Sequence, residues 1–304
     1  MQHPRWRVYA PDVPDVRHND HRWMENFLII LDRRGCNKRC PYCTAKITNW
    51  PCGNDRLHLL ADVLEGIQER GTLFDYLTIS GNGEPAFYRP ETLSFLREVI
   101  DTHRKPFRYL RIQTGGHLFF DPVKFEYFHD FIMELTRVAV DPEEDMRILG
   151  YRRDHTRTHT YKRATIGLNH VLLRANFPTL LDDLERYRDQ LGDRLHNVNL
   201  KILNVNTRVD ERTRTGEVFS PEARWIQQHA LLAEDVDRVI EQVSGRLPLV
   251  GTYNPITDQV VWDLHGVPLV MVTKRQRYGR LHVTFNKGEL IDYLLRPIPL
   301  DDLR

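Results

Sequence analysis

The apolar positions of the chain fall into two alternating patterns from residue 25 onward. Short apolar runs predict buried strands, and stretches with an apolar residue every three or four positions predict amphipathic helices. The predicted strands are 27–31, 76–80, 109–113, 137–141, 197–206 and 247–253. The predicted helices are 57–70, 91–104, 123–135, 143–175 with an interruption near Gly150, 178–192 and 221–243.

Alternation of strands and helices predicts parallel strands joined by crossover helices. Six such units over residues 25–250 predict an α/β fold, specifically a partial (β/α)6 TIM-like barrel. Residues 1–24 are rich in Pro, Asp, Arg and His and predict an N-terminal extension. Residues 251–304 change character, with short antiparallel strands around Gly266 and a short helix near 288–295, and predict a small C-terminal β-rich module.

Composition limits the classes of function. The 304 residues carry 43 basic and 42 acidic side chains, so bulk charge gives no argument for nucleic-acid binding, which stays open. The longest strongly apolar run, 27–31, is far too short to cross a membrane. The N-terminus has no apolar stretch typical of a signal peptide. We therefore expect a cytoplasmic protein with no membrane association.

All four cysteines of the chain lie between positions 36 and 52. A disulfide framework would distribute its cysteines, so this grouping predicts a metal site. Cys36, Cys40 and Cys43 have a spacing that can bind three irons of a cubane cluster and leave the fourth iron open. The alternative is a structural zinc site with Cys52 or His58 as the fourth ligand, although the chain lacks the second cysteine pair of a zinc ribbon.

The Cys-x3-Cys-x-aromatic-Cys motif directly after the first predicted strand resembles the radical S-adenosylmethionine (SAM) superfamily. This resemblance implies a [4Fe–4S] cluster on Cys36, Cys40 and Cys43, with SAM on the open iron and Tyr42 near the adenine. It also implies that an electron donor such as flavodoxin or ferredoxin drives the cleavage of SAM. The resulting 5′-deoxyadenosyl radical would abstract a hydrogen atom from the substrate.

Motifs at the ends of later predicted strands extend the resemblance over residues 25–250. GNGEP (81–85) resembles the Gly-Gly-Glu motif of the family, which holds the amino group of SAM, and a carboxylate suits that ammonium. IQTGGHL, VAVDPEE and LKILNVNTRVDE resemble the ends of the third, fourth and fifth strands. The implied SAM contacts are Asn82, Gly83, Glu84, Asp141, Asn204 and Asn206.

Substrate contacts are expected where the predicted strands end, because the working groups of β/α barrels lie there. Gln113 and His117 are such candidates. The basic segment 147–163 adds Arg152, Arg153 and Arg157, which could clamp an anionic substrate through bidentate hydrogen bonds. The same charges also fit a solvated helix face.

Three functions remain open at this stage. The first is a radical SAM enzyme acting on a small, anionic or nucleotide-like molecule. The second is a radical SAM enzyme modifying a protein or peptide, including activation of a glycyl-radical enzyme. The third is a non-enzymatic iron–sulfur or zinc protein. The GNGEP motif separates the first two from the third, and the lack of cysteines for further clusters favours the first.

Overall fold

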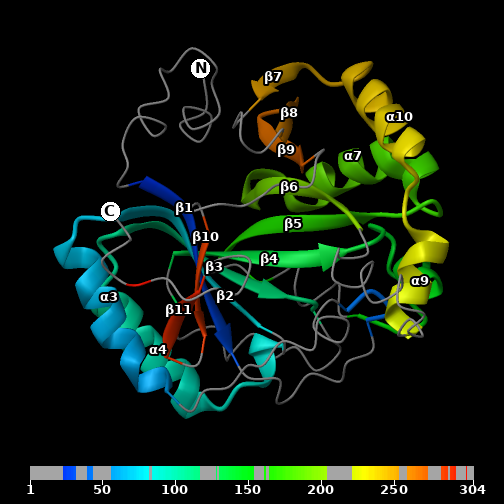
Figure 1. The fold of residues 1–304 in the computed structure, drawn as a ribbon. Coiled ribbons are helices and arrows are strands. Elements are labelled where there is room, and N and C mark those ends of the chain that lie inside the picture. The colour runs from blue at the N-terminus through cyan, green and yellow to red at the C-terminus, as the bar shows by residue number, and fades with distance from the viewer. Residues whose placement is uncertain are drawn as a thin grey trace.

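The computed structural model describes residues 23–31, 40–43, 56–81, 84–116, 128, 130–153, 161, 164–203, 221–252, 259–272, 282–286, 288–291 and 299. Helices and strands alternate along this part of the chain (Figure 1). The strands are β1 (Trp23–Leu31), β2 (Leu73–Gly81), β3 (Phe107–Thr114), β4 (Phe131–Arg137), β5 (Ala164–Leu172), β6 (Leu195–Ile202), β7 (Leu249–Thr252), β8 (Gln259–Leu264), β9 (Val267–Val272), β10 (His282–Asn286) and β11 (Glu289–Ile291). The α-helices are α3 (Leu60–Glu69), α4 (Pro90–Thr102), α5 (Pro142–Leu149), α7 (Leu180–Leu191), α9 (Pro221–His229) and α10 (Ala233–Ser244). Short 3-10 helices are η2 (Leu57–Leu59), η3 (Pro85–Phe87), η5 (Phe177–Thr179) and η6 (Gly192–Arg194).

All described strands belong to one open sheet. Its order is β11-β10-β1-β2-β3-β4-β5-β6-β9-β8-β7, so the two ends of the sheet do not meet. Strands β1 to β6 are neighbours in chain order, and each pairs in parallel with the next. This arrangement confirms the predicted α/β class and the partial barrel.

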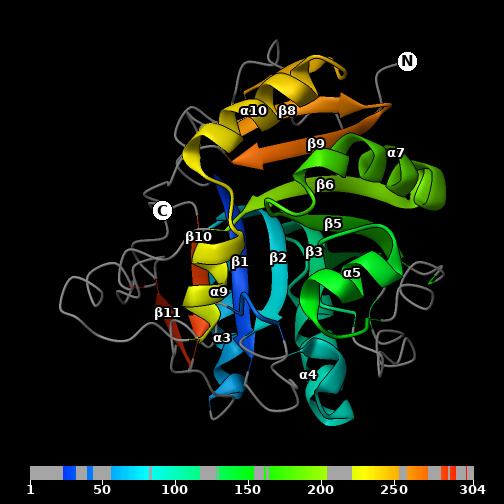
Figure 2. The same cartoon turned by 90° about the vertical axis from the view of Figure 1, so that its right-hand side faces the viewer.

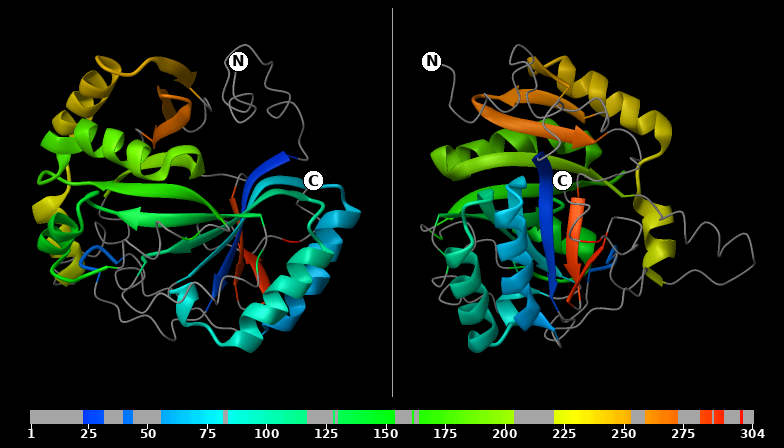
Figure 3. Two further views of the ribbon diagram at one scale, coloured as in Figure 1. Left: turned by 180° about the vertical axis from the view of Figure 1, so that it is seen from behind. Right: turned by 60° about the vertical axis from the view of Figure 1, so that its left-hand side comes forward.

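The strands after residue 251 join both edges of this sheet. The hairpin of β8 and β9 turns at Gly266, whose φ of +90° suits glycine, and β9 then pairs in parallel with β6. Strand β10 pairs in parallel with β1 at the other edge, where β11 completes the sheet. The right panel of Figure 3 shows β10 beside β1, far from β8 and β9. The C-terminal segment therefore widens the sheet in two directions.

The sequence prediction was wrong for two strands of this sheet, β4 and β5, although it was right for the helix that ends near Gly150. Residues 131–135 were predicted as the end of a helix, but they form β4, which ends at Arg137 where a strand was predicted to begin. Residues 164–172 were also predicted as helix, but they form β5. Both strands are buried on nearly every residue, as interior strands of a parallel sheet are. Such strands lack the polar–apolar alternation that identifies a strand, so a helix was assigned instead.

Three smaller predictions also need correction. The single helix predicted over 221–243 is two helices, α9 and α10, separated at residues 230–232. The predicted sixth barrel strand is β7, an edge strand that pairs antiparallel with β8, while the sixth parallel strand is β6. A helix was predicted near 288–295, but residues 289–291 of this range form the short strand β11.

The two faces of the sheet have different chemistry. One face packs against the helices, and apolar side chains such as Ile79 of β2, Ile112 of β3 and Leu64 of α3 form the main core there. Figure 1 shows α3 and α4 side by side against one half of the sheet, and Figure 2 shows α10 beside β8 and β9 at the other half. The opposite face carries polar side chains on β1 to β6, and we call it the inner face. Its polar residues include Asn26, Tyr76, Thr78, Tyr109, Arg111, Gln113, Glu134, Asn169, Asn197, Asn199 and Lys201.

Among the described helices, none combines the length and the apolar character needed to cross a lipid bilayer.

Candidate functional site

The described part of the cysteine loop, residues 40–43, follows β1 and forms a tight turn. The backbone N–H of Cys43 donates to the carbonyl of Cys40 at 3.2 Å, and both cysteine residues are half-buried. Burial raises the pKa of the Cys40 thiol, and the nearby carboxylate of Glu84 adds to that rise. Iron binds the thiolate, so cluster assembly would displace a proton from Cys40. Cys36 and Cys52 lie outside the described residues.

Glu84 lies at the end of the next strand, β2, and is held by the end of β3. Thr114 donates its hydroxyl hydrogen to Oε1 of Glu84, and the backbone N–H of Gly115 donates to Oε2 at 2.8 Å. The Glu84 residue is only 3% exposed. A carboxylate has about four acceptor positions, and an ammonium group is a suitable donor to such a group. The structure therefore aims a fixed carboxylate at the edge of the sheet that bears the cysteine loop.

Arg153 ties the cysteine loop to the end of β4. Its guanidinium donates to the Tyr42 hydroxyl at 2.7 Å and to the backbone carbonyl of Thr136. Burial raises the pKa of Tyr42 to about 12, although Arg153 opposes this rise, so the phenol stays protonated at neutral pH. The aromatic residue of the cysteine motif is thus locked in place through its hydroxyl group.

Buried charges surround this contact. The Arg153 side chain is 1% exposed, and its Nε lies 3.5 Å from Oδ2 of Asp145, which is fully buried. Asp145 also accepts the backbone N–H of Val138 at 3.0 Å. Arg137, likewise fully buried, donates to the carbonyl of Gly115 at 3.1 Å. Two guanidinium groups and one aspartate therefore form a charged layer under the carboxyl ends of β3 and β4.

A second hydrophobic core covers the cysteine loop and is separate from the main core. It contains Tyr42, Tyr151 and Ile226 of α9, and Cys40 packs against it. The ring of Trp225 on α9 lies 5.9 Å from the ring of Tyr42. Arg174 donates to the carbonyls of Gln227, Gln228 and Ala230 and so fastens the C-terminal end of α9 beside β5. Helix α9 is thereby held over the cysteine loop.

Two other predicted site residues have local roles on α5. Asp141 is the N-cap of this helix and accepts the backbone N–H groups of Glu143 and Glu144 at 2.9 Å each. Arg152 is exposed and forms an ion pair with Glu143 at 2.8 Å. The remaining predicted contacts lie outside the described residues: Asn82, Gly83, His117, Arg157, Asn204 and Asn206.

The inner face holds a polar network that the motif analysis missed, apart from Gln113. Its centre is Glu134, which is 1% exposed and accepts hydrogen bonds from Arg111 at 3.2 Å, Asn199 at 3.1 Å and Gln113. Burial alone would raise the pKa of Glu134, but Arg111, Lys201 and the donated amide hydrogens outweigh burial and lower it. Glu134 is therefore a carboxylate that orients its neighbours.

The residue at position 167 of β5, beside this network, is a glycine, and a larger side chain would crowd its neighbours. A Cβ on Gly167 of β5 would lie 2.9 Å from Oδ1 of Asn197 and 3.2 Å from Ile132.

The sequence did contain one signal of the network, because FRYLRIQT (107–114) alternates polar and apolar residues at the period of a strand. That alternation identifies a polar face on β3, but it does not identify the partners from β4 to β6.

The arrangement of these residues fits a site that holds an iron–sulfur cluster and, beside it, a ligand with an ammonium group. Within the described residues no three Cys, His, Asp or Glu side chains come together as a complete metal site, and the third motif cysteine lies outside them. Cys40 and Cys43 nevertheless supply two thiols from one turn, and thiolates are the ligands of such clusters. The fixed carboxylate of Glu84 lies close by. The fold and the site together define a cluster-binding α/β protein of the partial-barrel type.

Comparison with known proteins points to one family. Residues 30–172, just under half of the chain, match the model of the Radical SAM superfamily. Members of the family use a [4Fe–4S] cluster and SAM. None of the curated proteins compared with the chain has a matching sequence.

Two solved structures show a limited similarity to this chain, with TM-scores below 0.5. Native anSMEcpe with bound AdoMet is 15% identical, with a TM-score of 0.49, over 72% of this chain and 59% of its own. The FeFe-hydrogenase maturase HydG from Carboxydothermus hydrogenoformans is 14% identical, with a TM-score of 0.38, over 72% of this chain and 57% of its own. The chain thus spans less than three fifths of the length of these proteins.

Replacing Arg153 should destabilise the protein through Asp145. In Arg153→Met the side-chain volume is kept, but the buried carboxylate loses its ion-pair partner, and we expect the free energy of unfolding to fall by about 3 kcal/mol. Adding Asp145→Asn should recover part of this loss because the carboxylate that lost Arg153 is then replaced by a neutral amide. Urea unfolding followed by circular dichroism measures both effects.

The matched control is Arg97→Met, which removes the exposed ion pair with Asp101 on α4. Its effect should stay below about 1 kcal/mol. Equal losses for Arg97→Met and Arg153→Met would contradict the assigned role of Arg153.

Proposed function

We propose that the protein is a radical SAM enzyme that acts on a small, anionic or nucleotide-like substrate. One observation carries the proposal: within a radical SAM domain, the cysteine turn after β1 and the fixed Glu84 after β2 lie at the same edge of the sheet. An electron carrier needs no carboxylate of this kind, whereas SAM cleavage needs its amino group held beside the cluster.

The residues divide the work as follows. Cys36, Cys40 and Cys43 hold the cluster, and Glu84 accepts the ammonium group of SAM. Thr114 and Gly115 keep Glu84 in one orientation. When bound, the cluster would supply one electron for the reductive cleavage of SAM to methionine and a 5′-deoxyadenosyl radical. Asn82, Gly83, Asn204 and Asn206 remain proposed SAM contacts.

Tyr42 is proposed to lie against the adenine of SAM, in an orientation that Arg153 maintains. The second core around Tyr42 excludes water from that side of the loop. Asp141 remains a proposed SAM contact, although its Oδ1 already accepts two hydrogen bonds from the start of α5.

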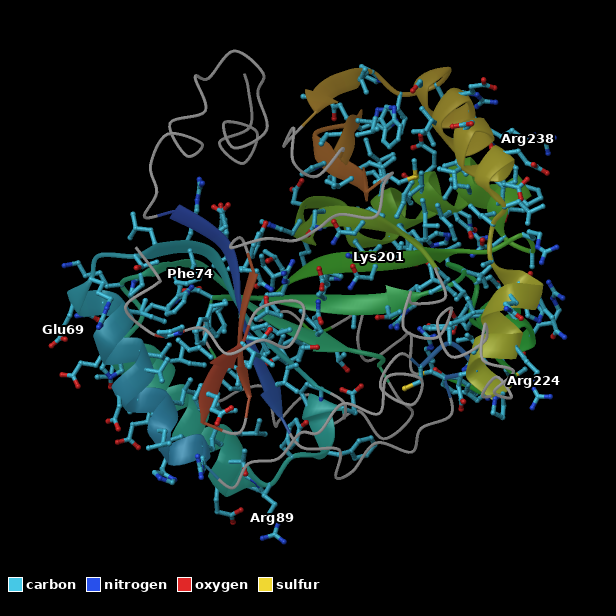
Figure 4. All side chains as sticks on the ribbon, in the orientation of Figure 1. Glu69, Phe74, Arg89, Lys201, Arg224 and Arg238 are labelled. Carbon is cyan, nitrogen blue, oxygen red and sulfur yellow. The ribbon has the colours of Figure 1, made fainter. Side chains whose placement is uncertain are left out.

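The charge of the inner face supports the proposal of an anionic substrate. Around Glu134 stand two cations, Arg111 and Lys201, so the group carries one excess positive charge. Arg111 lies 4.3 Å above the ring of Tyr76, and the ring of Tyr76 stacks on that of Tyr109 at 5.6 Å. In Figure 4 Lys201 lies near the middle of the molecule, whereas Glu69, Arg224 and Arg238 lie at the rim.

We therefore propose Arg111 as the main anion contact. Gln113, one residue before Thr114, would contact the part of the substrate nearest SAM. Arg152, Arg153, Arg157 and His117 remain proposed substrate contacts. Arg153 donates to Tyr42 and Arg152 pairs with Glu143, whereas Arg157 and His117 lie outside the described residues.

The wider setting is also proposed. A low-potential donor such as flavodoxin or ferredoxin would supply the electron, and the protein would work in the cytoplasm. Residues 25–250 would carry the catalytic unit, with 1–24 as an extension and 251–304 as a β-rich addition.

Protein purified without oxygen should contain iron and sulfide in the ratio of a [4Fe–4S] cluster and should release 5′-deoxyadenosine from SAM when reduced with dithionite. Cys→Ala at position 36, 40 or 43 should abolish both signals, and Cys52→Ala should leave both. Iron and sulfide analysis with chromatography of the nucleoside products tests this. Bound zinc without sulfide would refute the proposed function.

Glu84→Gln should weaken SAM binding. The amide oxygen can still accept from the N–H of Gly115 while the amide NH2 donates to the Thr114 hydroxyl oxygen. The side chain loses the negative charge that faces the ammonium, and this costs about 1.5–3 kcal/mol, or roughly 10- to 150-fold in affinity. Calorimetric titration of cluster-loaded protein with SAM measures the change. Glu98→Gln, on the exposed side of α4, is the control, and equal affinity in both variants would remove Glu84 from the site.

Arg111→Gln should remove anion binding at the inner face. Inorganic phosphate serves as the probe, and it should raise the thermal unfolding temperature of the parent protein, since a ligand stabilises the state that binds it. The rise should persist in Arg97→Gln, on the helix side of the sheet, and disappear in Arg111→Gln. The same rise in all three proteins would place the phosphate elsewhere.

A further inference from the structure

The cysteine loop has a contact that the SAM chemistry itself does not require. The hydroxyl oxygen of Tyr151 lies 2.9 Å from Sγ of Cys40, although the two residues are 111 positions apart in the chain. Tyr151 is 7% exposed and belongs to the second core, where its ring packs with Tyr42 and Leu149. The hydroxyl group is thus held against the sulfur by the packing of the ring.

The direction of this hydrogen bond follows from the state of the sulfur. A thiol and a phenol can each donate, so in the metal-free chain either atom can be the donor. A thiolate that binds iron has no hydrogen to donate and can only accept. With Cys40 as a ligand, Tyr151 must therefore be the donor.

A buried cation reinforces the same effect. The guanidinium of Arg153 lies 5.6 Å from the centre of the Tyr151 ring and also binds Tyr42 on the other side of the loop. Asp145 pairs with Arg153, but Arg137 is buried in the same layer, so these three residues carry one excess positive charge. Positive potential in a region of low dielectric acts strongly on a nearby charge.

We propose that Tyr151 is a positioning residue that donates a hydrogen bond to the cluster ligand Cys40 and thereby raises the reduction potential of the cluster. The proposal rests on the proposed function, which makes Cys40 a ligand. One electron enters from an external one-electron donor, and no bond is made or broken in that step. The reduced cluster carries one more negative charge than the oxidised cluster, so a donated hydrogen bond and a buried cation favour the reduced form.

This effect differs from that of packing alone. A tyrosine that only fills space could be replaced by phenylalanine with no change in potential, because the ring and its contact with Arg153 would remain. The hydroxyl group alone distinguishes the two roles. Hydrogen bonds to cluster sulfurs are one of the means by which proteins set cluster potentials.

The test compares Tyr151→Phe with the parent protein, both reconstituted with iron and sulfide. Tyr161→Phe is the matched control, because Tyr161 is a buried tyrosine of the main core and not of the second core. Each protein is titrated with dithionite in the presence of redox mediators, and electron paramagnetic resonance measures the reduced cluster. The titration is made without SAM, so it does not depend on turnover.

In Tyr151→Phe we expect full cluster content and a lower midpoint potential, seen as an about three- to tenfold smaller ratio of reduced to oxidised cluster at a fixed potential. Tyr161→Phe should match the parent. An unchanged midpoint in Tyr151→Phe, or loss of its cluster while Tyr161→Phe keeps one, would overturn the proposal and leave the proposed function standing. A parent protein that assembles no cluster would overturn both.

Discussion

The geometry of the site depends on the contacts of one buried group, the guanidinium of Arg153. It joins the cysteine loop, through Tyr42, to the carbonyl of Thr136 in β4 and to the carboxylate of Asp145 in α5. A charge buried this completely is tolerated only with a partner, so the α5 segment has to supply Asp145 at that place. Helix α5 in turn keeps its position through the Asp141 cap and the left-handed Gly150 at its end. The loop that would hold the cluster is therefore oriented by a segment more than a hundred residues away.

The two faces of the sheet differ in chemistry, apolar on the helix side and polar on the inner face. On the helix side, apolar side chains form most of the main core. On the inner face, Glu134 collects donors from β3 and β6 and keeps Arg111, Gln113 and Asn199 in fixed orientations. The lowered pKa of Glu134 keeps it charged, which sustains that order. A rigid polar surface below a site for radical chemistry is suited to hold a substrate in one position, which is what hydrogen abstraction at close contact requires.

The C-terminal strands contribute by location rather than by chemistry. In the described part of the chain, β9 lies against β6 and β10 lies against β1, so neither end of the six-stranded parallel unit is an edge. Unpaired strand edges are prone to pair with other chains, and covering them is a common protection. The small antiparallel hairpins, rather than a closed barrel, complete the sheet.

Much of the fold and of the site could be predicted from the sequence alone, because the signals for these features lie within short stretches of the chain. The first three strands were predicted from their short apolar runs, and the helices between them from their amphipathic period. The cysteine and GNGEP motifs were recognised because their residues are close in sequence. Strands β4 and β5 were missed because they are buried on both faces, where the period that identifies a strand is lost. The contacts of Tyr151 with Cys40, of Arg153 with Tyr42 and of Glu134 with Asn199 join residues 111, 111 and 65 positions apart. Their energies come from desolvation and hydrogen bonding inside the folded chain, so only the tertiary structure decided them.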